Sequence, residues 1–156
     1  MKKIKVGFLP LYIKLYDDSQ GVGYRAPMEK YMNMAINMLE TQGIEIVQAD
    51  VCRIKPEFDA AAAMFNEADV DAVITFHLAY SPSLESEKAL AATELTIIIL
   101  DTTPDFTYDQ FTDSAALMLN HGIHGVQDMC NLLIRNGKTF TVCAGHMDHS
   151  NVLQKV

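Results

Sequence analysis

Three short stretches of this chain carry side chains that could contact a polar ligand. They are residues 76–82 (FHLAYSP), 119–125 (LNHGIHG) and 144–146 (AGH), and all five histidines lie in them or just beyond them. Imidazole and phenol groups can both donate and accept hydrogen bonds, and an aromatic ring also offers a flat apolar surface. A ligand that is a row of hydroxyls along a carbon chain needs this combination. The pattern therefore predicts a ligand-binding rim.

Two pairs of histidines are spaced so that both side chains could reach one metal ion. The pairs are His121 with His124, and His146 with His149, which has Asp148 beside it. Imidazole is a common metal ligand, but it is equally common as a capping or exposed loop side chain. Because neither pair has a well-placed third ligand, we expect no metal ion and no other cofactor in this chain.

The nucleophiles of the sequence lie in poor contexts for catalysis. Ser81 and Ser83 flank Pro82 and can cap a helix, and no Gly-x-Ser-x-Gly turn is present. The cysteines have no Cys-x-x-Cys spacing, which favours buried, reduced thiols. They are Cys52, Cys130 and Cys143. We therefore expect no catalytic residue of this kind.

Two further motifs have competing interpretations. Asp101 and Asp105 follow an apolar run and could act as general acid and base, although loop aspartates usually form turns or caps. Gly21 and Gly23 lack the third glycine of a dinucleotide-binding fingerprint, and they do not join a strand directly to a helix. A nicotinamide or flavin dinucleotide is therefore not expected.

Apolar runs and helical spacings alternate along the chain. Short apolar runs predict five strands, at residues 4–9, 44–47, 71–75, 95–100 and 139–143. Helices are predicted from Pro27 to about 39, after Pro56, after Pro82, and at 113–119 and 123–135, with Gly122 as a break. Residues 151–156 resemble the first turns of a helix, which predicts that the natural protein continues past them.

This alternation predicts an α/β fold with three layers, αβα, around a five-stranded parallel sheet. The expected strand order is 2-1-3-4-5, as in flavodoxin-like folds, with residues 1–156 forming a single domain. Ligands of such sheets bind beyond the carboxyl ends of the strands. Several of the polar residues follow predicted strands, with Pro10 to Tyr12 after the first, His77 and Tyr80 after the third, and His146 after the fifth.

Composition restricts the partners and the compartment. The net charge of −8 leaves no basic face for a phosphate backbone, so we expect no nucleic-acid partner. No apolar run approaches the ~20 residues that cross a bilayer. The positive residues 1–3 lead into an apolar run that is too short for a signal peptide. We therefore expect a cytoplasmic protein without membrane partners.

At these residues the chain resembles the amino-terminal domain of L-arabinose isomerases and, more broadly, the L-arabinose and L-fucose isomerase group. Residues 76–82 are similar to a Trp-Leu-His-Thr-Phe-Ser-Pro stretch that follows the third strand in arabinose isomerases. Residues 120–125 are similar to an Asn-x-x-x-His-Gly segment, and Gly145-His146 is similar to a Gly-His after the last strand. The order and spacing agree along most of the chain.

The resemblance implies an aldose to ketose isomerase that moves hydrogen between C1 and C2 of an open-chain sugar. It implies that Mn²⁺ or another divalent metal is bound by carboxy-terminal domains missing from this chain, so that the chain alone is inactive. The amino-terminal domain of the group contacts sugar in a neighbouring subunit of a homo-oligomer. The implied substrate-binding residues are Leu11, Tyr12, His77, Tyr80, His124 and His146.

Departures from the group's motifs favour a related branch over an arabinose isomerase proper. Pro10 stands about where the group has a substrate-binding glutamine, and His77 is shifted by one position from the group's histidine. Two alternatives remain open: a stand-alone flavodoxin-like module that binds a small metabolite or regulates, and a simple oligomerisation domain. A phosphorylation-type receiver is not expected, because Asp17 and Asp18 come too late after the first strand.

Overall fold

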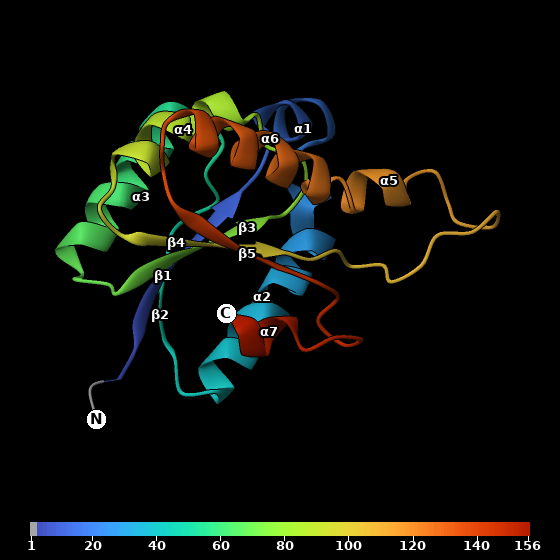
Figure 1. Cartoon of the computed structure of the whole chain (residues 1–156). Helices are drawn as coiled ribbons and strands as arrows, with labels where there is room; N and C mark the ends of the chain where they lie inside the picture. The colour runs from blue at the N-terminus through green and yellow to red at the C-terminus, as the bar shows by residue number, and fades with distance from the viewer. Residues whose placement is uncertain (1–2) are drawn as a thin grey trace.

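The computed structural model describes residues 3–156, which form a five-stranded parallel sheet with helices on both faces (Figure 1). The order across the sheet is β2-β1-β3-β4-β5, and every neighbouring pair is parallel. This confirms the predicted flavodoxin-like, three-layer fold. The strands are β1 (Lys5–Leu11), β2 (Glu45–Gln48), β3 (Ala72–His77), β4 (Thr96–Asp101) and β5 (Phe140–Ala144).

The central strands are apolar throughout because both faces of the sheet are covered. All six residues of β3 are buried. Successive side chains point to opposite faces, so Ile74 packs in one core cluster and its neighbour Val73 packs in the other. A continuous apolar run therefore marks these strands better than an alternating pattern does.

Helices form the two outer layers. In Figure 1, α3, α4 and α6 lie over one face of the sheet, whereas α2 and α7 lie over the other. Among residues 3–156, no helix has the length and apolar character that crossing a membrane requires. The helices are α1 (Lys14–Gln20), α2 (Ala26–Thr41), α3 (Lys55–Glu67), α4 (Ser83–Ala92), α5 (Ala116–Leu119), α6 (Gly122–Arg135) and α7 (Val152–Lys155), with a 3₁₀ turn, η1 (Val22–Arg25).

The predicted helix boundaries follow from local chemistry. Pro27 and Pro56 are each the second residue of a helix, where the missing backbone N–H costs nothing. After α2, Gly43 has a φ of 89°, a left-handed conformation that favours glycine. These signals account for the agreement between the predicted helices and α2 and α3.

Two strands extend further than the sequence analysis predicted. β1 continues through Pro10 and Leu11, and the carbonyl oxygen of Pro10 accepts a hydrogen bond of 2.9 Å from the backbone N–H of Cys52. β3 continues to His77, which lies in register with Leu11. The sequence analysis placed Pro10, Leu11 and His77 in loops after the strands. They are instead the last residues of β1 and β3.

Other differences concern helices. The short helix α1 and the turn η1 were not predicted. Gly122 does not break a helix but begins α6, and the break lies at Asn120 and His121. The predicted helix at the end of the described chain is present as α7.

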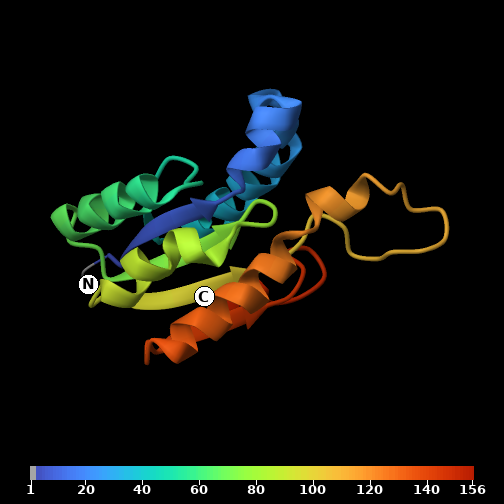
Figure 2. The ribbon, with the colours of Figure 1, turned by 90° about the horizontal axis from the view of Figure 1, so that it is seen from above.

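The connection between β4 and α5 leaves the body of the molecule. Residues 102–115, called the arm below, extend away from the sheet and helices in two perpendicular views (Figures 1 and 2). The arm begins at the carboxyl edge of the sheet, where β4 ends at Asp101. It therefore starts beside the residues that the sequence analysis proposed as a rim.

Candidate functional site

A cluster of phenol and imidazole rings lies at the carboxyl edge of the sheet. Tyr80 follows β3, His121 and His124 lie at the start of α6, and Tyr16 comes from α1. The ring of His121 has its centroid 5.3 Å from that of Tyr80 and 4.7 Å from that of His124. The hydroxyl of Tyr16 lies 3.4 Å from Nδ1 of His121. These four residues are called the rim cluster.

Two glycines bring the start of α6 onto the end of β3. A Cβ atom on Gly122 would lie 2.9 Å from the carbonyl oxygen of His77, and one on Gly125 would lie 2.6 Å from Cδ2 of the same residue. Contacts below 3.0 Å cannot be accommodated without movement. In each of the pairs His121-Gly122 and His124-Gly125, the glycine thus lets the backbone of α6 approach His77 closely, and the histidine before it places its ring in the rim cluster.

The members of the rim cluster differ in exposure and protonation. His124 is exposed, and its ring nitrogens have no side-chain hydrogen bond within the described residues. Burial, and then the neighbouring His124, lower the pKa of His121, which favours its neutral form. Burial, and then the carboxylate of Asp128, raise the pKa of the Tyr80 hydroxyl. These shifts favour the neutral forms of His121 and Tyr80.

The asparagine that precedes the rim cluster holds the base of the arm. The Nδ2 of Asn120 donates to Oδ2 of Asp105 at 2.7 Å and to the carbonyl oxygen of Ala116 at 2.8 Å. Its Oδ1 accepts from the backbone N–H of Asp105 at 2.9 Å. Asn120 is buried, and its side chain binds both Asp105 in the arm and Ala116 in α5. It therefore fixes the arm against α5.

His146 lies in a second group of rings, at the ends of β4 and β5. Its Nδ1 accepts a hydrogen bond of 3.1 Å from the backbone N–H of Asp148, and its Nε2 lies 3.2 Å from the carbonyl oxygen of Pro104. Because a backbone N–H only donates, the Nε2 of this ring carries the proton. Both nitrogens are engaged, so only the ring face is available to a ligand. His149, in contrast, stacks on Phe106 with the centroids 4.1 Å apart.

Three predicted site residues lie beneath the rim cluster. Leu11 and Tyr12 are completely buried and His77 is 5% exposed. The hydroxyl of Tyr12 and both ring nitrogens of His77 have no hydrogen-bond partner among the described residues. Burial raises the pKa of Tyr12 and lowers that of His77 to about 3, so both side chains are neutral. Of the six predicted residues, only Tyr80 and His124 come together at the surface.

An ionic network supports α1 at this edge. Oδ2 of the buried Asp17 accepts from Nη1 of Arg25 at 2.7 Å and from Nη1 of Arg53 at 2.9 Å. Arg25 also pairs with Glu29, and Arg53 pairs with Glu57. Both arginines are ion-paired with carboxylates of this chain, so they do not offer a site for an anion. Their shared contact with Asp17 joins η1 to the loop after β2.

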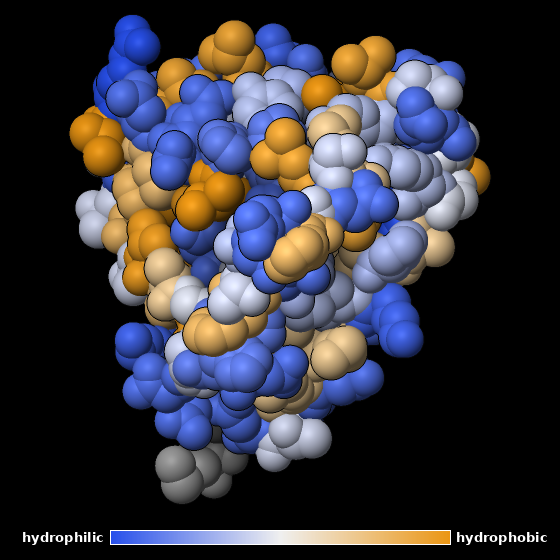
Figure 3. Space-filling view, turned by 90° about the vertical axis from the view of Figure 1, so that its right-hand side faces the viewer, coloured by the Kyte–Doolittle hydropathy of each residue, from blue (hydrophilic) through white to orange (hydrophobic). Residues whose placement is uncertain are grey.

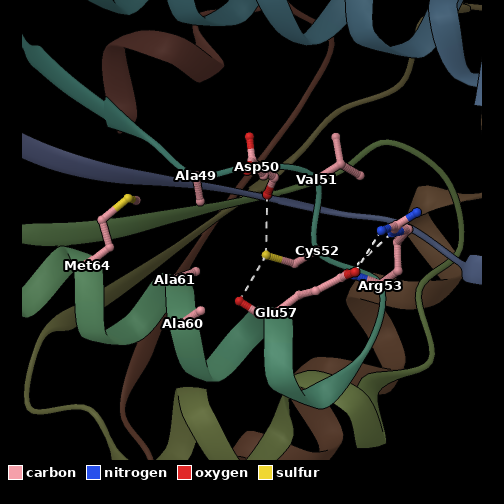
Figure 4. A pocket seen from close by; sticks show the side chains of 9 residues that line it. All are labelled: Ala49, Asp50, Val51, Cys52, Arg53, Glu57, Ala60, Ala61 and Met64. Atoms are coloured by element: carbon pink, nitrogen blue, oxygen red, sulfur yellow. Dashed lines mark hydrogen bonds and ion pairs between the residues drawn. The ribbon is translucent and has the colours of Figure 1, made fainter.

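A hollow of about 280 Å³ lies between the end of β2 and α3 (Figure 4). Cys52 points into it, and its Sγ donates to the carbonyl oxygens of Asp50 and Glu57. Burial, and then the neighbouring carboxylates, raise the pKa of this thiol to about 12, which makes it a poor nucleophile. None of the predicted site residues lines this hollow.

A second hollow, of about 300 Å³, lies at the ends of β4 and β5. Burial raises the pKa of the Asp101 carboxyl in its wall. Ile123, next to His124 in the sequence, lines the same hollow, as does His146. The start of α6 therefore lies between this hollow and the rim cluster.

Residues 3–156 contain no group of three His, Cys, Asp or Glu side chains that could hold a metal ion. The sequence analysis did not place His121 or Tyr16 in the site. Their signals were weak: His121 stood out only as half of a metal-like pair, and Tyr16 lies in a helix that was not predicted.

No protein-family model matches the chain, and no curated protein matches it significantly.

Proposed function

We propose that this chain is the amino-terminal, substrate-contacting and oligomerisation domain of a metal-dependent aldose to ketose isomerase related to the L-arabinose and L-fucose isomerases. The observation that carries the proposal is the meeting of Tyr80, His121 and His124 at the carboxyl edge of the sheet. Two of the sequence motifs that resemble this group, at residues 76–82 and 119–125, contribute all three side chains. The motifs thus converge on one surface.

The chemistry of the rim cluster suits an open-chain sugar. Each hydroxyl of such a sugar both donates and accepts, and the exposed imidazole of His124 can do the same through its two nitrogens. The ring of Tyr80 is partly exposed beside His121 and supplies a flat surface for the carbon chain. Burial, and then Asp128, which accepts a hydrogen bond from it, raise the pKa of the Tyr80 hydroxyl, so the hydroxyl stays protonated and its oxygen can accept from the sugar. The cluster would hold and orient the sugar.

Among residues 3–156, no group of three His, Cys, Asp or Glu side chains is placed to hold a divalent metal. The two histidine pairs lack a third ligand, and both ring nitrogens of His146 are engaged. When bound, the metal of such an isomerase polarises the sugar oxygens between which hydrogen moves. Under the proposal, residues outside this chain hold that metal, and this domain contributes binding and orientation.

Substitution of His124 tests the proposal in the longer enzyme that it implies. His124→Ala should remove a hydroxyl partner and cost about 1–3 kcal/mol of transition-state binding, roughly ten- to hundredfold in kcat/KM for the sugar. The melting temperature should hardly change, because His124 is exposed. Asn131→Ala, at another exposed position of α6, is the matched control and should behave as wild type.

Tyr80→Phe separates stacking from hydrogen bonding. The variant keeps the aromatic plane and removes the hydroxyl, so a mild effect would assign Tyr80 to stacking. If the enzyme variants with His124→Ala and with Tyr80→Phe both isomerise the sugar at the wild-type rate, the rim cluster does not contact the substrate and the proposal fails. If this chain binds sugar but no longer protein that contains it isomerises sugar, the result would instead support a stand-alone metabolite-binding module.

A further inference from the structure

The arm carries the most exposed aromatic side chains of the described chain. Phe106 is 59% exposed, Tyr108 is 53% exposed and Phe111 is 85% exposed. In Figure 3 the face that bears the arm shows apolar side chains among hydrophilic ones. Aromatic residues projected into water in this number are unusual for a surface without a partner.

The arm has a shape of its own. At its tip, the backbone N–H groups of Phe111 and Thr112 donate to Asp109, to its Oδ1 at 2.8 Å and to its carbonyl oxygen at 3.1 Å. At its base, Asn120 holds Asp105. The tip is thus a hydrogen-bonded turn that presents Phe111 outward, and little conformational freedom would be lost when a partner covers it.

A groove of about 470 Å³ lies beside the base of the arm, between α1 and α5. Leu15, which is 61% exposed, Tyr24 and Met118 give it apolar walls. Ser114 and Ala115, the last residues of the arm, form part of the same wall. The arm and the groove therefore lie next to each other on one face.

We propose that two copies of this chain associate about a twofold axis near α5, each placing its arm, with Phe111 foremost, in the groove of the other. An isologous contact requires the projecting feature and its receptor to lie side by side on the same face, and they do. The inference names the partner and the surface for the oligomerisation part of the proposed function, on which it rests.

The aromatic rings of the arm supply about half of the area that a dimer needs from each partner. At about 200 Å² per aromatic side chain, the three rings alone expose roughly 400 Å². A stable interface takes about 800 Å² from each partner. The receiving groove supplies more, since Leu15 in its wall is 61% exposed. One reciprocal pair of arms and grooves therefore approaches a standard interface.

Charge does not drive this pairing. Residues 89–134 contain no lysine or arginine, so the arm carries only the negative charges of Asp105, Asp109 and Asp113. Lys14 begins α1 next to Leu15, and its side chain is 51% exposed in an ion pair with Asp18. Because Asp18 already neutralises Lys14, the association rests on apolar contact.

Sedimentation equilibrium of this chain tests the inference with four proteins. The wild type should dimerise, and Phe111→Ser in the arm or Leu15→Glu in the groove should raise the dimer Kd at least tenfold. Leu84→Ser, which removes a similarly exposed residue (62%) from α4, should leave it unchanged. Circular dichroism should show unchanged folding, because Phe111, Leu15 and Leu84 are all more than half exposed.

A photo-crosslinking residue at position 111 locates the contact. In a mixture of tagged and untagged copies, it should label residues 14–24 or 114–118 of the other copy. A monomer at every concentration, an assembly of odd order, a dimer that survives both variants, or labelling elsewhere overturns the inference. Tyr16 lines the groove as well, but Tyr80 and His124 do not, so sugar titration is read at these two residues. An arm-mediated dimer that binds no sugar would refute only the substrate part of the proposed function.

Discussion

At the scale of single residues, His77 is the most unusual side chain of the molecule. It ends β3, is 5% exposed, and neither ring nitrogen has a partner among the described residues. Burial, and no neighbouring charge, lowers its pKa from 6.5 to about 3. A buried polar group without partners lowers the free energy of unfolding, so this imidazole destabilises the contact between β3 and α6.

This burial makes stability depend on pH in a defined direction. Between pH 6.5 and about 3 the unfolded chain binds a proton at His77 that the folded chain does not, so folding weakens as the pH falls. At about 1.4 kcal/mol per pKa unit, the loss from pH 7 to pH 5 is about 2 kcal/mol. His77→Leu, of similar size, should abolish this part of the pH dependence.

Denaturant unfolding of both proteins at pH 7 and pH 5 measures the effect. For each protein, the free energy of unfolding at pH 5 is subtracted from that at pH 7. The carboxylates titrate in both proteins, so the difference between the two results reports His77 alone. An equal loss of stability in the two proteins would show that His77 gains a partner or water on protonation.

His77 and His121 also show what residue-scale sequence reasoning misses. The strand prediction ended at residue 75, because residues 76–82 were assigned to the rim motif and a histidine after a strand was taken as a rim residue. Its burial depends on where α6 packs, which no local pattern reveals. His121 joins Tyr80 for the same tertiary reason.

At the scale of elements, the packing of α6 on β3 positions the rim cluster. Gly125 allows this approach, because a Cβ atom there would lie 2.6 Å from Cδ2 of His77 and 3.1 Å from the backbone nitrogen of Ser81. The sequence indicated a glycine-containing helix start but not its contact. The short helix α1 was missed because its sequence is polar, and the ion pairs of Asp17 with Arg25 and Arg53 that support it are formed only in the folded chain.

Gly125→Ala tests this packing. We expect the free energy of unfolding to fall by about 1–3 kcal/mol, because the added methyl overpacks the contact. Gly23→Ala is the control, since no atom lies within 4 Å of its Cβ position and its φ is not positive, and it should change stability by less than about 0.5 kcal/mol. Adding His77→Ala should rescue Gly125→Ala. Equal effects of the two alanines would contradict the close approach.

At the scale of the whole molecule, the order of strands determines which residues can meet. The five strands were predictable because each is a short apolar run with a helix between, and a parallel sheet places all the carboxyl ends at one edge. The rim cluster follows from that order, since Tyr80 follows β3 and Tyr16 follows β1, its neighbour in the sheet. The arm was not predictable as a projecting segment, because its sequence indicates only a loop.

The most direct test of the proposed function is a titration of the ¹⁵N-labelled chain with L-arabinose, L-fucose and their alditols, followed by NMR. We predict weak binding, on the order of millimolar, with shifts concentrated at residue 80, at 121–125 and in the imidazole of His124. His124→Ala should reduce these shifts, whereas Asn131→Ala should not. Shifts confined to the hollow beside Cys52, or no shifts with any of these ligands, would contradict the claim that the rim cluster binds sugar.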